Sequence, residues 1–117
     1  MAFEELLKEL AARRQRALGM GGAEKLAQRK AQGVLNARER IDRLFDPGTF
    51  LESGLLAVSN RPEDRLTTPA DGKVAGFGRI DGRDAGVLAN DFTVKGASSA
   101  AINIKKLKHI CQFIVGF

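Results

Sequence analysis

The segment from Lys95 to Ser99 holds a lysine, a glycine and two serines, residue types that suit the binding of an anion. It precedes a predicted helix, and the free backbone N–H groups at the start of a helix attract negative charge. Lys105 and Lys106 add positive charge further along that helix. The simpler interpretation is that Ser98 or Ser99 caps the helix, so the sequence leaves both roles open.

The only histidine and the only cysteine, His109 and Cys111, lie two residues apart in the last predicted helix, at about 100–115. Because residues i and i+2 of a helix do not face each other, the pair is poorly placed for nucleophilic catalysis. The apolar stripe of this helix is predicted to comprise Leu107, Ile110, Cys111 and Ile114. We therefore expect Cys111 to be a small core residue, and His109 to lie on the surface with Lys105, Lys108 and Gln112.

No familiar catalytic or metal-binding motif is present in the sequence. Gly76-Phe77-Gly78 suggests a dinucleotide fingerprint, but its third glycine would fall at Asp81, and the segment is typical of a strand. Asp81, Gly82 and Asp84 offer too few ligands for a calcium loop. One cysteine and one histidine exclude an intrachain disulfide and a Cys/His metal site, and no metal is expected.

The composition favours a folded chain of one small domain or a piece of a larger one. Of 117 residues, 44% are hydrophobic and 28% are charged, which excludes a disordered tail. No apolar run approaches the roughly 20 residues of a membrane span, and the N-terminus does not resemble a secretory signal. The sequence therefore predicts a cytoplasmic protein without a membrane partner.

Positive charge is concentrated at the front of the chain. Residues 1–45 hold ten basic and six acidic residues, a net charge of +4 out of +5 in total. Such a basic stretch can bind nucleic acid or an acidic partner, but no aromatic residues interleave with it to stack bases. A solvated helix face with i, i+4 pairs is the simpler interpretation, and nucleic-acid binding ranks last; the pairs are Glu9–Arg13 and Glu39–Arg43.

Three helices are predicted in this basic region. The first carries an apolar stripe of Phe3, Leu6, Leu7 and Leu10 and ends at the glycines of 19–22. The second covers 23–32 and is followed by Gly33. The third begins at the N-cap Asn36, with Glu39 completing a capping box, and ends at Asp46-Pro47-Gly48. Its buried face is predicted to comprise Ala37, Ile41, Leu44 and Phe45.

Short strands and turns are predicted for the middle of the chain. Residues 55–59 are expected to form a short strand, and 60–68 a loop. A strand over 73–80 is expected to place Val74, Gly76, Gly78 and Ile80 on one face and Ala75 and Phe77 on the other. Asp81-Gly82 suits a two-residue type I′ hairpin turn. The apolar run 85–89 is typical of a strand covered on both faces.

Two segments resemble a known family. The first, KAQGVLNARERIDRLFDPGTF at 30–50, is similar to the "GKLTARERIDLLLDPGTF" stretch of carboxyltransferase (beta) subunits of biotin-dependent acyl-CoA carboxylases. The second, DGKVAGFGRIDGR at 71–83 followed by ANDFTVKG at 89–96, resembles that family's hairpin and loop. The two segments occur in the family's order, and the resemblance extends over roughly residues 20–115. Members of this family include propionyl-CoA, acetyl-CoA and methylcrotonyl-CoA carboxylases.

The resemblance implies an α+β or α/β fold: N-terminal helices, then the first hairpin and helix of a crotonase-like (ClpP/crotonase) domain that is incomplete. A basic helical region is expected at 1–48 and the start of the carboxyltransferase domain at 49–117. The family's activity is the transfer of a carboxyl group from carboxybiotin, held on a separate carrier, to an acyl-CoA. The implied partners are acyl-CoA, the remaining carboxyltransferase polypeptide and the biotin carboxylase and biotin carrier subunits, with no covalently bound cofactor.

Some features of the family pattern are not found among these residues. In the family, glycine-rich loops whose backbone N–H groups stabilise the enolate and the biotin oxygen follow the region matched here. Those loops and the second domain are not among these residues, and Ala97 stands where many members have a second glycine. We therefore expect an N-terminal fragment without catalytic residues, inactive alone and marginally stable without another polypeptide to cover its apolar faces.

The resemblance also implies a role for the basic residues in binding the CoA phosphates. The candidates are Arg38, Arg40, Lys95, Gly96, Ser98 and Ser99. For the two arginines, the alternatives are ion pairs with Glu39 or Asp42 and contacts between subunits. The alternative for the whole chain is a non-enzymatic interaction module that binds a partner subunit or an acidic partner through its basic helices.

Overall fold

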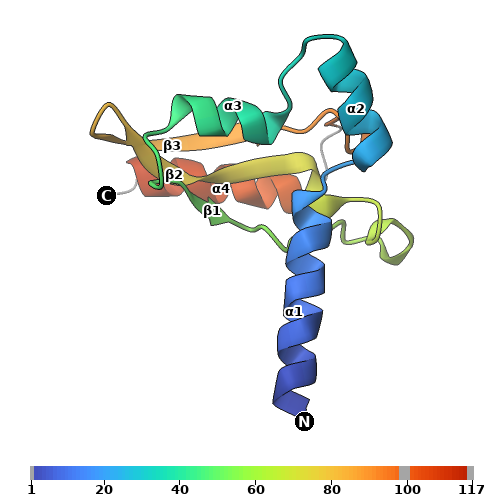
Figure 1. The fold of residues 1–117 in the computed structure, drawn as a ribbon. Helices are drawn as coiled ribbons and strands as arrows, with labels where there is room; N and C mark the ends of the chain where they lie inside the picture. Colours follow the sequence, from blue (N-terminus) through green and yellow to red (C-terminus); the bar gives the residue numbers. More distant parts are fainter. Residues whose placement is uncertain (1, 98–100, 116–117) are drawn as a thin grey trace.

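The computed structural model describes residues 2–97 and 101–115, and within them the N-terminal helices precede an antiparallel sheet and a last helix (Figure 1). The helices are α1 (Ala2–Leu18), α2 (Ala23–Ala31), α3 (Ala37–Leu44) and α4 (Ala101–Val115). The strands are β1 (Leu51–Ser53), β2 (Lys73–Ile80) and β3 (Arg83–Asn90). No helix in the described part of the chain is long and apolar enough to cross a membrane.

The sheet has the strand order β1-β2-β3, with both pairs antiparallel. Strand β2 covers the predicted residues, and Ile80 pairs with Arg83, so that the hairpin loop has two residues. Asp81 and Gly82 both have positive φ, 50° and 77°, which is the conformation of a type I′ turn. The hairpin predicted from the sequence is therefore confirmed.

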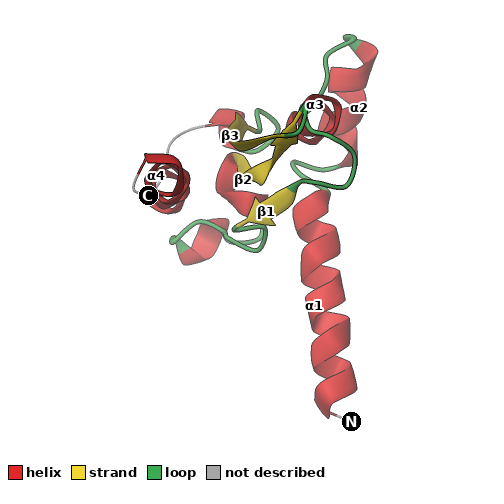
Figure 2. Cartoon of the chain, turned by 90° about the vertical axis from the view of Figure 1, so that its left-hand side faces the viewer, coloured by secondary structure: helices red, strands yellow, loops and turns green. Residues whose placement is uncertain are grey.

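The sheet lies between α3 on one face and α4 on the other (Figure 2). On the α3 face, the buried core comprises Met20, Ala37, Ile41, Phe45 and Val74. On the other face, the Phe77 ring meets the His109 ring of α4 edge-on, with ring centroids 6.4 Å apart. The alternation of side chains along β2 predicted from the sequence is thus confirmed.

Helix α3 is fixed at both ends by side chains. At its start, the Asn36 side chain accepts a hydrogen bond from the Glu39 backbone, and the Glu39 carboxylate accepts one from the Asn36 backbone. Just past its end, the Asp46 carboxylate accepts hydrogen bonds from the backbone N–H groups of Asp81 and Gly82, at 2.9 and 2.8 Å. The capping box is confirmed, and Asp46 ties the hairpin turn to this helix.

The first strand was predicted at the wrong residues. Residues 55–59 form turns and irregular backbone, whereas Leu51–Ser53 pairs with β2. Gly54 has a φ of 77°, and the Ala57 N–H donates to its carbonyl, so the chain turns away from the sheet at that glycine. Residues 55–59 therefore have no strand to pair with.

The buried faces of two helices also differ from the prediction. In α4, Lys106 and Ile110 are buried, whereas Leu107 and Cys111 are exposed; Ile114 lies outside the described side chains. The Lys106 amine donates to the carbonyls of Ala70 and Lys73, so the side of α4 that carries Lys106 and Ile110, and not the predicted stripe, faces the start of β2. In α3, Leu44 is half-exposed because only the side of Ile41 and Phe45 faces the sheet.

Strand β3 is not fully covered, contrary to the prediction for 85–89. Residues 85–89 are of intermediate exposure, since β3 lies at the edge of this sheet. Large apolar side chains elsewhere in the described chain are also exposed, as expected for a partly covered layer. They include Phe3, Leu6, Leu51, Leu66 and Phe92.

Candidate functional site

The segment 91–97, which contains the predicted anion site, is held by an internal network. The buried Asp91 carboxylate accepts hydrogen bonds from the backbone N–H and the hydroxyl of Thr93, at 2.9 and 2.5 Å. The Asp91 N–H donates to the carbonyl of Gly72, at the start of β2. Further on, Lys95 and Gly96 have positive φ, 46° and 60°. This segment is therefore a fixed turn.

The link between α1 and α2, residues 19–22, packs directly on this turn. The Gly21 N–H donates to the Thr93 hydroxyl at 2.9 Å, and the Lys25 amine donates to the Thr93 carbonyl at 3.3 Å. A Cβ on Gly21 would lie 2.0 Å from that carbonyl oxygen, so only glycine permits the approach. The N-terminal helices are thereby attached to the segment 91–97.

Lys95 and Gly96 lie at the outer end of the turn. The Lys95 amine forms an ion pair with the Asp64 carboxylate at 2.6 Å, and both side chains keep some solvent exposure. Gly96 is exposed, and a Cβ on it would meet no atom within 4 Å. Together they present a cation and open backbone. Ser98 and Ser99, the other predicted residues of this segment, lie outside the described residues.

Arg40 reaches the same segment from α3. Its side chain lines a small cleft together with Arg29, Asn90 and Phe92. The Arg29 guanidinium lies 5.7 Å from the centroid of the Phe92 ring, and that ring is 56% exposed. The cleft is small, about 30 Å³, and it brings Arg29 and Arg40 next to the residues that begin the segment 91–97.

Arg38 lies elsewhere, although it is only two residues from Arg40. Its two terminal nitrogens donate to the two carboxylate oxygens of Glu52 on β1, at 2.5 and 3.1 Å. Both side chains are largely buried, and the Arg38 Nε has no hydrogen-bond partner within the described residues. The sequence suggested Glu39 or Asp42 as ion-pair partners of Arg38, but the structure gives it Glu52.

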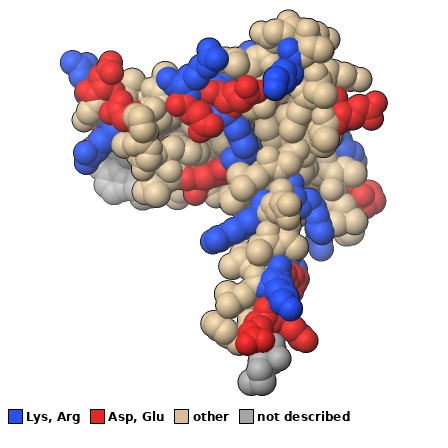
Figure 3. All heavy atoms as spheres, viewed as in Figure 1, with Lys and Arg blue, Asp and Glu red and all other residues tan. Residues whose placement is uncertain are grey.

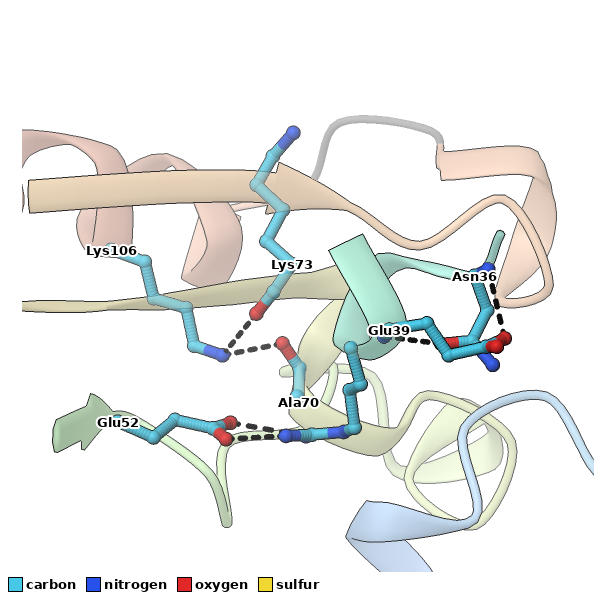
Figure 4. Close-up of polar contacts among 7 residues, drawn as sticks. Asn36, Glu39, Glu52, Ala70, Lys73 and Lys106 are labelled. Carbon is cyan, nitrogen blue, oxygen red and sulfur yellow. Dashed lines mark hydrogen bonds and ion pairs between the residues drawn. The ribbon is translucent and has the colours of Figure 1, made fainter. Parts of the chain in front are cut away.

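A buried lysine, Lys106, lies beside this ion pair, and together with Arg38 and Glu52 it forms a buried polar cluster (Figure 4). The Lys106 amine donates to the carbonyls of Ala70 and Lys73, at 2.5 and 2.8 Å. Burial lowers the pKa of Lys106 from 10.5 to about 8; the Glu52 and Asp71 carboxylates oppose this shift, and Arg38 adds to it. Ala70 and Asp71 both have positive φ, so the amine stabilises a strained turn at the start of β2.

The structure thus divides the predicted site residues into two groups. Lys95 and Gly96 belong to the segment 91–97 and Arg40 lies beside its start, whereas Arg38 belongs to the buried cluster with Glu52 and Lys106. The sequence did not indicate the roles of Glu52 and Lys106. One signal for Lys106 was its position four residues before Ile110, which places a lysine on the buried face of α4.

Comparisons with known proteins agree with the resemblance seen in the sequence. Residues 28–114 match the family described as "Carboxyl transferase domain". The chain is 36% identical over 110 residues to the propionyl-CoA carboxylase carboxyltransferase subunit of Haloferax mediterranei, covering 92% of this chain and 21% of that protein. It is 42% identical over 107 residues to the mitochondrial methylcrotonoyl-CoA carboxylase beta chain of Arabidopsis thaliana, covering 91% and 18%.

A solved structure shows the same fold. The transcarboxylase 12S hexamer, determined with hydrolysed methylmalonyl-coenzyme A bound, superposes with a TM-score of 0.84 at 33% identity. The match covers 92% of this chain and 21% of that one. The chain therefore spans about a fifth of the length of the relatives that it matches. The crotonase-like fold predicted from the sequence is confirmed as a partial domain.

Proposed function

Since the chain belongs to the carboxyl transferase domain family, we propose that it forms the N-terminal part of the carboxyltransferase domain of a biotin-dependent acyl-CoA carboxylase subunit. The match over residues 28–114 carries this proposal, because it includes both the sheet and the segment 91–97. In the complete enzyme, the N–CO₂ bond of carboxybiotin breaks. The carboxyl group then joins the α-carbon of acyl-CoA, and the proton that this carbon gives up ends on the biotin nitrogen that carried the carboxyl group.

Within that enzyme, we propose that this chain binds the phosphates of CoA. Arg40 lines the cleft beside the start of the segment 91–97, Lys95 supplies a cation within that segment, and Gly96 leaves its backbone open to a ligand. The proposed set also includes Arg38, Ser98 and Ser99. Arg38 already pairs with the Glu52 carboxylate, so Arg40 and Lys95 are the residues to test first. Phosphate binding by Lys95 would replace its exposed ion pair with Asp64, at little cost.

Alone, these 117 residues are expected not to carboxylate acyl-CoA. The resemblance places the glycine-rich loops that stabilise the enolate outside them, and preorganised N–H donors are a large part of such catalysis. The proposed partners are therefore the remaining carboxyltransferase polypeptide, a biotin carrier and a biotin carboxylase. Carboxylation by the purified chain alone, supplied with carboxybiotin and propionyl-CoA, would overturn this part of the proposal.

A non-enzymatic interaction module is the second candidate function. It is favoured by the exposed apolar residues of α1, which nothing else in the described chain covers. The two candidates differ in one respect: a carboxyltransferase segment must support turnover when it is joined to the rest of such a subunit, and an interaction module need not.

Lys95→Ala is predicted to raise the KM for acyl-CoA when residues 28–114 replace the matching segment of the Haloferax mediterranei subunit. Losing one charge-assisted contact to a phosphate should raise KM about fivefold or more. The kcat should change little, because a phosphate contact binds substrate and transition state alike. Steady-state kinetics with propionyl-CoA measure both values.

Arg83→Ala is the matched control, because Arg83 is an exposed cation in the hairpin far from the segment 91–97. It should leave both constants unchanged. An active hybrid whose KM is the same with and without the Lys95→Ala substitution would contradict the proposed phosphate site. A hybrid that folds but has no activity would instead favour the interaction module.

A further inference from the structure

The loop 60–68, yellow-green at the right of Figure 1, is closed at its base by side-chain hydrogen bonds. The Ser59 N–H donates to the Thr68 hydroxyl at 2.9 Å, and both residues are buried. The same hydroxyl donates to the carbonyl of Asp64 at 2.8 Å. Beyond this base, the residues of 61–67 are exposed, with the exception of Asp64. The loop is therefore a unit of its own, and Asp64 is the residue in it that turns towards the body.

The Asp64 carboxylate ties this loop to the segment 91–97 through its ion pair with Lys95. The two charged atoms are 2.6 Å apart, within the range of a charge-assisted hydrogen bond. Lys95 has a φ of 46°, which a residue with a β-carbon keeps only where its surroundings fix the backbone. Because the segment 91–97 is a fixed turn and the loop is exposed, separation of the pair moves the loop and leaves the segment in place.

The ion pair is open to a ligand. Acidic and basic side chains both lie at the surface on the right-hand side of the molecule, where the loop is found (Figure 3). The Lys95 side chain is 47% exposed and that of Asp64 is 21% exposed. An ammonium group has three donors, but a carboxylate and a phosphate held on the same cation repel each other. Asp64 and a phosphate therefore compete for Lys95.

We propose that Asp64 regulates the phosphate site as its internal counter-ion: Asp64 pairs with Lys95 until CoA displaces it, and the displacement releases the loop 60–68 from the segment 91–97. This inference rests on the proposed binding of CoA phosphates by Lys95. By linkage, the factor by which the Asp64 pair weakens CoA binding is also the factor by which CoA weakens the pair. CoA affinity and the state of the loop should therefore change together.

Asp64→Asn should tighten the binding of CoA to the 117-residue chain about two- to fivefold at low salt, because it removes a competitor for Lys95. Isothermal titration calorimetry measures the affinity. Asparagine removes the charge but keeps the size of the side chain, and the backbone carbonyl at this position still closes the loop. Partial unfolding would lower the affinity, so a gain in affinity distinguishes competition from a merely structural role of Asp64.

Glu63→Gln is the matched control, because Glu63 is the exposed carboxylate next to Asp64 and its removal changes the net charge equally. It should leave the affinity for CoA unchanged. In a Lys95→Ala background, Asp64→Asn should improve CoA binding less than about half as much, because its effect acts through Lys95. An equal gain in both backgrounds would mean that Asp64 only repels the ligand directly, and would overturn the proposed competition.

Amide NMR follows the release of the loop. In the wild type, CoA should shift the amides of 61–67 together with those of 91–97. In Asp64→Asn, it should shift those of 91–97 alone, because the loop is already released. If CoA shifts 91–97 but not 61–67 in the wild type, or binds Asp64→Asn no more tightly than the wild type, the role of Asp64 is refuted and the phosphate site stands. If CoA shifts neither segment, both are refuted.

Discussion

Replacing Lys106 by methionine is expected to destabilise the chain by about 2 kcal/mol at pH 7. The substitution leaves the carbonyls of Ala70 and Lys73 without the donor that they have in the structure. It also removes the cation beside the Asp71 carboxylate, in a turn whose backbone is strained. Because a small domain is stable by only a few kcal/mol, much of the folded population should be lost. Urea unfolding followed by circular dichroism measures this difference.

The same lysine should make stability depend on pH in a defined direction. Its pKa is about 8 in the folded chain, lowered from 10.5 by burial. Between these values the unfolded chain binds the extra proton, so the wild type gains stability as pH rises. This increase in the free energy of unfolding is complete above about pH 10.5 and is lost as the pH falls through 8. It amounts to up to about 3 kcal/mol. The stability difference between the wild type and Lys106→Met should therefore widen from pH 7 to pH 10.

Lys105→Met is the control for both measurements, because Lys105 is the exposed neighbour on the same helix. It should have little effect on stability at either pH. A Lys106→Met chain as stable as the wild type at pH 7, or a difference that narrows as pH rises, would contradict the role assigned to the buried amine.

Gly76→Ala is expected to detach β1 from the sheet and to destabilise the chain by about 3 kcal/mol. A Cβ on Gly76 would lie 2.2 Å from the carbonyl oxygen of Leu51 and 2.7 Å from the Phe50 ring. The first of these neighbours is backbone, so no rotamer change relieves the clash. Because Glu52 lies on β1, its ion pair with Arg38 should be lost as well. Urea unfolding and amide hydrogen exchange of β1 measure the two effects.

Gly19→Ala serves as the comparison, since the nearest atom to a Cβ there is 3.3 Å away and φ is not positive. Its effect should stay within about 0.5 kcal/mol. If Gly76→Ala were equally mild and left β1 protected from exchange, the close packing of β1 on β2 would be refuted.

Local signals in the sequence predicted the helices and the hairpin well. The capping box at Asn36, the glycines after α1 and α2 and the Asp81-Gly82 turn act within a few residues, so their effect is visible without the fold. The strand β1 could not be placed in this way. Its position depends on pairing with β2 more than twenty residues later, and the apolar residues 55–59 made a better local strand than Leu51–Ser53.

The candidate site was predicted in its types of residue but only partly in its arrangement. Arg38 and Arg40 are equivalent in sequence, yet one is committed to Glu52 and the other lines the cleft beside Phe92. The difference follows from which side of α3 faces β1, which only the packing decides. In the sequence Lys106 resembles a surface charge because lysine is seldom buried, and its two carbonyl acceptors are more than thirty residues away. The domain boundary at residue 48 stays a prediction.

The most direct test of the central claim, that the segment 91–97 with Arg40 and Lys95 binds the phosphates of CoA, is a titration of the 117-residue chain followed by amide NMR. CoA is expected to shift the amides of 91–97 and of Arg40, with an affinity that falls as salt is added. Pantetheine, which lacks the phosphates, should leave them unchanged. If CoA shifts none of these amides, or if pantetheine shifts them equally, the assignment of this segment as a phosphate site is wrong.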